Sequence, residues 1–155
     1  MNINITNGAP IVQWLKLTNG NQATTSNVIG NITDLVFTAQ ANSVYIINGS
    51  IHLGCNNTGG VKLGCTIPAA ATMHLNFSGS TTSSAAYLWQ PDATSGALTS
   101  AYCTENNANR GVFIGGTITI GATAGTIQLG FASGTDTQTS TIYQEGTAIF
   151  IQKVA

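Results

Sequence analysis

The stretch GGTITIGATAGTIQLGFAS, residues 115–133, carries the strongest structural signal in the chain. Ile118 and Ile120 alternate with threonines, and the apolar residues continue on one parity from Ile127 after a short glycine-flanked loop. Alternation of apolar and polar side chains with a period of two is typical of a β-strand with one buried face. The stretch therefore predicts two strands joined as a hairpin, with one wet face and one buried face.

The same pattern recurs on both sides of this stretch, and no apolar face with the period of a helix persists over ten residues. We expect ten strands, at residues 11–17, 34–39, 43–53, 61–67, 72–77, 86–89, 98–102, 112–120, 126–132 and 147–154. Polar, glycine-rich turns between them, such as CNNTGG at 55–60, are read as hairpin turns. The prediction is an all-β, antiparallel β-sandwich or jelly roll with almost no helix. It comprises an extended arm at residues 1–10 and a single domain at 11–155.

One segment, residues 43–53, allows two interpretations. Asn48-Gly49 is a strong signal for a two-residue hairpin turn. A continuous strand would instead place Tyr45, Ile47, Ile51 and Leu53 on one face, which is equally consistent with the sequence. Periodicity does not decide between the two.

The composition excludes several classes of function. Only 6% of the 155 residues are charged and the formal net charge is −1, whereas a typical soluble domain is about 25% charged. The four Lys and Arg residues form no cluster, so no nucleic-acid partner is expected. Neither a secretory signal nor an apolar run long enough to cross a membrane is present, so no membrane partner is expected either.

Groups that support catalysis or metal binding are scarce. The five carboxylates, at Asp34, Asp92, Glu105, Asp136 and Glu145, are isolated beside turn-forming residues, and we interpret them as solvated loop acids or turn acceptors. The single possible metal set is His52, Cys55, Cys65 and His74, whose spacing is not that of a zinc site; the histidines are better explained as half-buried strand residues. The three cysteines cannot all pair within the chain, and we expect reduced thiols. No cofactor, metal or catalytic residue is predicted.

Two sets of aromatic and apolar residues are candidates for contact with a partner. The last predicted strand is apolar on both parities, which suits a central strand or one packed against another subunit. The candidate subunit or capsid interface is therefore Trp14, Ile149, Phe150 and Ile151. The Ser/Thr-rich region at 78–110 is interrupted by aromatic residues, and these form a candidate exposed recognition loop: Tyr87, Trp89 and Tyr102.

Three segments together resemble a family of small bacteriophage virion proteins that includes head-decoration (cement) proteins and modules of head and tail fibres. They are DLVFTAQANSVYIINGSI, the Pro68-Ala69-Ala70 turn, and GGTITIGATAGTIQLGFASGTDTQTSTIYQEGTAIFIQKVA. The matching positions are Asp34, Leu35, Phe37, Ala41, Asn42, Tyr45, Thr123, Ala124, Gly125, Thr126, Gln128, Leu129, Phe131, Ala132, Gly146 and Val154. The region between residues 78 and 110 departs from the family pattern.

This resemblance implies one continuous strand at 43–53, a homotrimer and a purely structural role. The expected function is that of a capsid decoration protein, made in the host bacterial cytoplasm and placed on the outer surface of the virion capsid. There it would clamp neighbouring major capsid subunits. A receptor- or carbohydrate-binding module of a tail or head fibre is the alternative.

Overall fold

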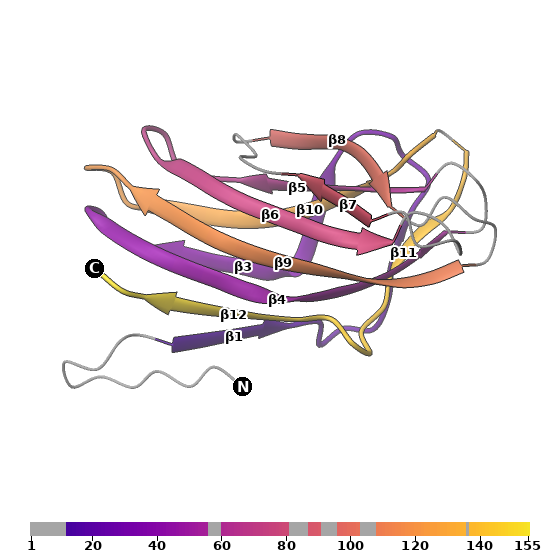
Figure 1. Cartoon of the computed structure of the whole chain (residues 1–155), viewed down its shortest axis with the longest axis horizontal. Coiled ribbons are helices and arrows are strands. Elements are labelled where there is room, and N and C mark those ends of the chain that lie inside the picture. Colours follow the sequence, from indigo (N-terminus) through magenta and orange to yellow (C-terminus); the bar gives the residue numbers. More distant parts are fainter. Residues whose placement is uncertain (1–11, 56–59, 81–86, 91–95, 103–107, 136) are drawn as a thin grey trace.

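The computed structural model describes residues 12–55, 60–80, 87–90, 96–102, 108–135 and 137–155 (Figure 1). From residue 80 to residue 108 the description covers the backbone of the strands alone. All regular elements in the described part are strands, and no helix there is long and apolar enough to span a membrane. The predicted arm at residues 1–10 lies outside the described residues.

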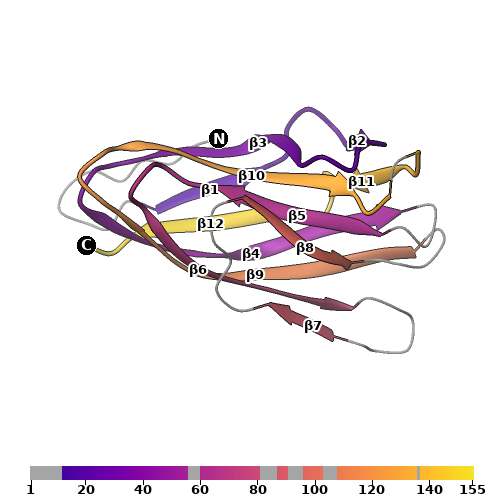
Figure 2. The same ribbon diagram turned by 90° about the horizontal axis from the view of Figure 1, so that it is seen from above.

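The described residues form twelve strands in two antiparallel sheets that pack face to face (Figures 1 and 2). The eight-stranded sheet has the order β1 (Val12–Lys16), β12 (Ala148–Lys153), β4 (Ser43–Cys55), β9 (Ala108–Ile120), β6 (Thr72–Ser80) and β7 (Tyr87–Gln90), with β11 (Ser140–Ile142) pairing both β4 and β2 (Gln22–Thr24). The four-stranded sheet has the order β3 (Gly30–Ala39), β10 (Gly125–Ser133), β5 (Val61–Thr66) and β8 (Gly96–Tyr102). The predicted all-β sandwich is confirmed.

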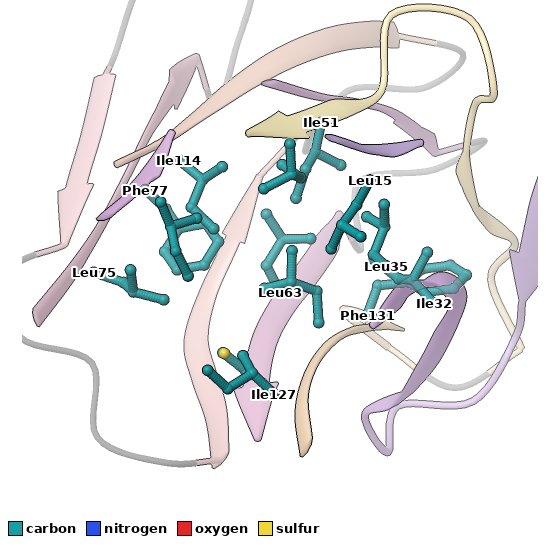
Figure 3. Packing of buried hydrophobic residues seen from close by; sticks show 14 of the residues in the cluster. Leu15, Ile32, Leu35, Ile51, Leu63, Leu75, Phe77, Ile114, Ile127 and Phe131 are labelled. Carbon is teal, nitrogen blue, oxygen red and sulfur yellow. The ribbon is translucent and has the colours of Figure 1, made fainter. Parts of the chain in front are cut away.

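The core lies between the sheets and is built by alternation along each strand. Figure 3 shows Leu15, Ile51 and Ile114 from the eight-stranded sheet meeting Leu63 and Phe131 from the other. These side chains are 5% exposed or less. Because polar side chains on the same strands face away from this layer, each sheet has one dry and one outer face.

Strand β4 decides the ambiguous segment in favour of one continuous strand. Its residues pair without interruption from Ser43 to Cys55 with β9. Asn48 and Gly49 lie in mid-strand, opposite Phe150 and Ile149 of β12 on the other side. The hairpin interpretation of Asn48-Gly49 is therefore wrong.

The predicted hairpin at 115–133 is also wrong, although both of its strands exist. β9 pairs with β4 and β6 in one sheet, whereas β10 pairs with β3 and β5 in the other. The loop at 121–124 thus crosses the sandwich as an arch, and the backbone N–H of Asn42 donates to the carbonyl of Gly121 at its base, at 2.8 Å. Ile118 and Ile127 still share one core, because they enter it from opposite sheets.

The CNNTGG segment likewise connects the two sheets and is not a hairpin turn. β4 ends at Cys55 in the eight-stranded sheet, and β5 begins at Val61 in the four-stranded sheet. Residues 56–59 between them lie outside the described part of the chain.

Candidate interaction surface

The outer face of the eight-stranded sheet carries exposed aromatic side chains and almost no charge. Trp14 on β1 is 52% exposed and Phe113 on β9 is 67% exposed. Among the described outward-facing positions of β1, β12, β4, β9 and β6, Lys16 is the only Lys, Arg, Asp or Glu. The other positions hold Val12, Val44, Ile46, Asn48, Ser50, His52, Gly54, Thr72, His74, Asn76, Ser78, Asn109, Gly111, Gly115, Thr117, Thr119, Ala148, Phe150 and Gln152.

One row of paired residues crosses this face from strand to strand: Trp14, Phe150, Asn48, Gly115 and Asn76. The rings of Trp14 and Phe150 meet edge to face, with centroids 5.3 Å apart and 66° between their planes. A Cβ at Gly115 would lie 3.3 Å from the Asn48 Oδ1. The row therefore begins with two aromatic rings, Trp14 and Phe150, and reaches a residue without a side chain at Gly115. The outer face of the sheet is hollow at Gly115.

A shallow groove of about 620 Å³ follows this row. Trp14 on β1 and Phe113 on β9 flank the two strands between them, β12 and β4. Every lining residue is uncharged; they are Trp14, Asn48, Gly49, Ser50, Asn76, Ser78, Phe113, Ile114, Gly115, Gly116 and Ala148. The groove thus has aromatic sides, a floor of small residues and no ionisable group.

The polar side chains that line the groove differ in whether they form hydrogen bonds within the protein. The Ser50 hydroxyl donates to the Gly146 carbonyl at 2.8 Å. The side-chain amides of Asn48 and Asn76, in contrast, make no hydrogen bond to any described residue. Amides beside aromatic faces suit a neutral, partly polar partner better than a charged one.

The four predicted interface residues separate into two pairs. Trp14 and half-buried Phe150 lie together on the outer face, where a partner has access to them. Ile149 and Ile151 point the other way and are 0% and 3% exposed, so their side chains belong to the core. Phe113 was missed by the sequence reasoning, although a large aromatic residue on the polar parity of a predicted strand is a readable signal.

The predicted recognition residues lie on two different sheets. Tyr87 and Trp89 belong to β7, at the edge of the eight-stranded sheet, and Tyr102 belongs to β8, at the edge of the four-stranded sheet. Their side chains lie outside the described part of the structure. The hypothesis of an aromatic recognition loop stays a prediction.

The histidines and cysteines that the structure describes do not form a cluster of three or more possible metal ligands. Cys55 and Cys65 are buried thiols in the core, whereas His52 lies on the outer face with its Nδ1 2.8 Å from the Glu145 carbonyl oxygen. His52 is half-buried, as predicted, but His74 is exposed, so that prediction is wrong. Within the described residues, no three His, Cys, Asp or Glu side chains are grouped as metal ligands. Cys103 lies outside the described part.

Asp34 is the described acid with the most polar contacts, and its role is structural. Its carboxylate accepts hydrogen bonds from the backbone N–H of Thr18 at 2.8 Å and of Asn19 at 3.3 Å. The Thr18 hydroxyl and the Asn19 amide donate to it as well. The backbone hydrogen bond from Thr18 is the largest cause that lowers the pKa of Asp34 below its ordinary value; desolvation comes second and opposes it, and the other three hydrogen bonds lower the pKa further. Asp34 thus holds the β1–β2 loop against β3, while Asp92, Glu105 and Asp136 lie outside the described residues.

Comparison with known proteins gives distant likenesses in structure alone. The sequence matches no protein-family model and no curated protein. Among solved structures, Eiger TNF from S. frugiperda is 11% identical with a TM-score of 0.45, covering 94% of this chain and 93% of that one. The tripod (BppUct-A-L) from the baseplate of bacteriophage Tuc2009 is 12% identical with a TM-score of 0.33, and the match spans 91% of this chain and 62% of that one. These values are too low to assign a family or a function.

Proposed function

We propose that this chain is a non-enzymatic structural protein of a bacteriophage particle. It is a capsid decoration protein that forms homotrimers and clamps neighbouring major capsid subunits on the outer surface of the head. The observation that carries the proposal is the outer face of the eight-stranded sheet, with its exposed Trp14 and Phe113 and its near-absence of charge. Exposed apolar patches with polar surroundings mark protein–protein contact sites.

The sequence resemblance to small virion proteins supports the same role. Two packed antiparallel sheets provide broad faces, and a broad face suits a lasting contact with a partner protein. A clamp of this kind raises the barrier to rupture of the head by occupying the repeated sites of the shell.

Purified particles test the proposal. Quantitative gel densitometry should find the protein in hundreds of copies per particle, and phage lacking it should adsorb normally but lose DNA sooner on heating or in chelator. A few copies per particle, together with failure of the deletion phage to adsorb, would reject decoration in favour of a fibre.

The second candidate is a receptor- or carbohydrate-binding module of a phage tail or head fibre. It is favoured by the pairing of aromatic side chains with the amides of Asn48 and Asn76 in one groove. This function predicts saturable binding of a neutral glycan by the isolated protein, which a glycan array followed by calorimetry would detect.

A further inference from the structure

The groove on the outer face lies beside protruding aromatic residues of the same face. Phe113 and Trp14 stand out from β9 and β1, and the small residues Gly115, on β9, and Ala148, on β12, line the groove with them. We propose that this face is the contact between copies of the chain, and that the groove receives an aromatic side chain, Phe113 or Trp14, of a second copy. The inference rests on the proposed function, whose trimer it supplies with an interface.

Charge is the first argument for a second copy as the occupant. All the groove residues are uncharged, so the groove offers no counter-charge to an ionic partner. A second copy matches this chemistry, because the whole chain carries only nine Lys, Arg, Asp and Glu residues and a net charge of −1. Repulsion between two such copies is weak.

Shape is the second argument. A small ligand would fill the hollow over Gly115 but would leave Phe113, at 67% exposure, in water. Further copies cover the hollow and the protruding rings together, because one face carries both. In a trimer, each copy would receive the ring of one neighbour in its hollow and place its own ring in the hollow of the other neighbour, which is the heterologous contact that closes a ring.

Size is the third argument. Five neighbouring strands form this face, in the order β1, β12, β4, β9 and β6. At the usual strand spacing they are together roughly 24 Å wide, and they run side by side over roughly 20 Å, with β4 and β9 extending further. Treated as flat, the face therefore has an area of roughly 500–700 Å², to which the uneven surface of the side chains adds. This area is of the order needed on each side of a stable protein–protein interface.

Two positions on the same face of β9 provide a matched pair of variants. Gly115→Leu fills the hollow, and its Cβ meets only the movable Asn48 amide at 3.3 Å. Gly111→Leu adds the same side chain four positions away, outside the groove, where a Cβ meets nothing within 4 Å. Phe113→Ser removes an exposed ring and leaves the core unchanged. It therefore tests the same contact even if the Gly115→Leu protein fails to fold.

Sedimentation equilibrium over a range of concentrations measures the effect, with circular dichroism to verify the fold. Gly115→Leu and Phe113→Ser should each weaken self-association by at least about tenfold, as expected for central residues of an interface, whereas Gly111→Leu should not. If wild-type protein associates and all three variants associate equally well, the inference fails while the decoration role stands, because particle densitometry tests that role separately.

Two other outcomes overturn the inference in different ways. A wild-type protein that stays monomeric at micromolar concentrations contradicts the trimer of the proposed function, and the inference with it. Binding of a neutral glycan that Gly115→Leu abolishes, with the oligomer unchanged, assigns the groove to a saccharide instead.

Discussion

At the scale of single residues, Asp34 shows how one carboxylate organises a region that has few charges. It receives hydrogen bonds from Thr18 and Asn19, which are 16 and 15 residues away. The contact holds the β1–β2 loop of the eight-stranded sheet against β3 of the four-stranded sheet, and the alternation along the strands does not reveal such a contact. The sequence predicted a solvated loop acid or a turn acceptor at Asp34 but did not identify its partners, because those depend on how the sheets stack.

The lowered pKa of Asp34 predicts a pH-dependent contribution to stability. A carboxyl group whose pKa is lower in the folded state stabilises the fold above its unfolded pKa, and this contribution is lost as pH falls through the folded pKa. Asp34→Asn should therefore be less stable than wild type near neutral pH, and the difference should shrink below about pH 4. Urea unfolding of both proteins across this range checks it, and a difference independent of pH would contradict the assignment.

Cys65 should be chemically inert in the folded protein. Burial raises the pKa of its thiol to about 12, so the reactive thiolate is almost absent near pH 8. Iodoacetamide should leave Cys65 unlabelled in native protein and label it in guanidinium, as read by mass spectrometry of peptides. Labelling of native Cys65 as fast as that of a free thiol in solution would show that the core opens there.

At the scale of elements, β9 illustrates what alternation does and does not reveal. Its buried positions, such as Val112 and Ile114, were readable, and all ten predicted strands exist. The identity of its neighbours was not readable, because Ile118 is equally well buried in a hairpin or in an arch. The two missed strands, β2 and β11, have three residues each, which is too short for a period of two to emerge.

Replacement by alanine should affect the stability of the protein very differently at two glycines of β9. Gly116 has a φ of +149°, and a Cβ there would overlap the His74 carbonyl oxygen of β6. Gly116→Ala should cost about 2–4 kcal/mol, because it combines backbone strain with a clash that β6 must relieve. Thermal or urea unfolding measures this cost.

Gly111 is the matched control, because a Cβ there meets nothing within 4 Å. Gly111→Ala should stay within about 1 kcal/mol of the wild-type free energy of unfolding, since the new methyl group meets no clash and alanine has less conformational freedom to lose than glycine. Equal losses for the two variants would mean that the approach of β6 to Gly116 is looser than described.

At the scale of the whole molecule, the packing of the two sheets separates the four residues of the predicted interface. Trp14 and Phe150 lie on the outer face, and their part in an interface stays a prediction, whereas Ile149 and Ile151 lie in the core. A strand that is apolar on both parities does not reveal which side chains face the other sheet. That distinction depends on which faces of β1 and β12 the four-stranded sheet covers.

Self-association should depend weakly on salt. Lys16 is the one Lys, Arg, Asp or Glu at the described outward positions of the five strands, so ionic screening has little to act on. Raising sodium chloride from about 0.05 M to about 0.5 M should change the dissociation constant less than about tenfold. Analytical ultracentrifugation at both concentrations checks this, and a change of several orders of magnitude would require ion pairs at the contact.

The pairing of β1 with β12 also has a consequence for biosynthesis. Phe150 is translated 136 residues after its strand partner Trp14. At a typical rate of about 5–20 residues per second, β1 waits on the order of ten seconds for the strand that completes its sheet. Until then β4 presents an open edge to its surroundings, so a nascent chain of this protein depends on protection during synthesis more than a chain built from local hairpins does.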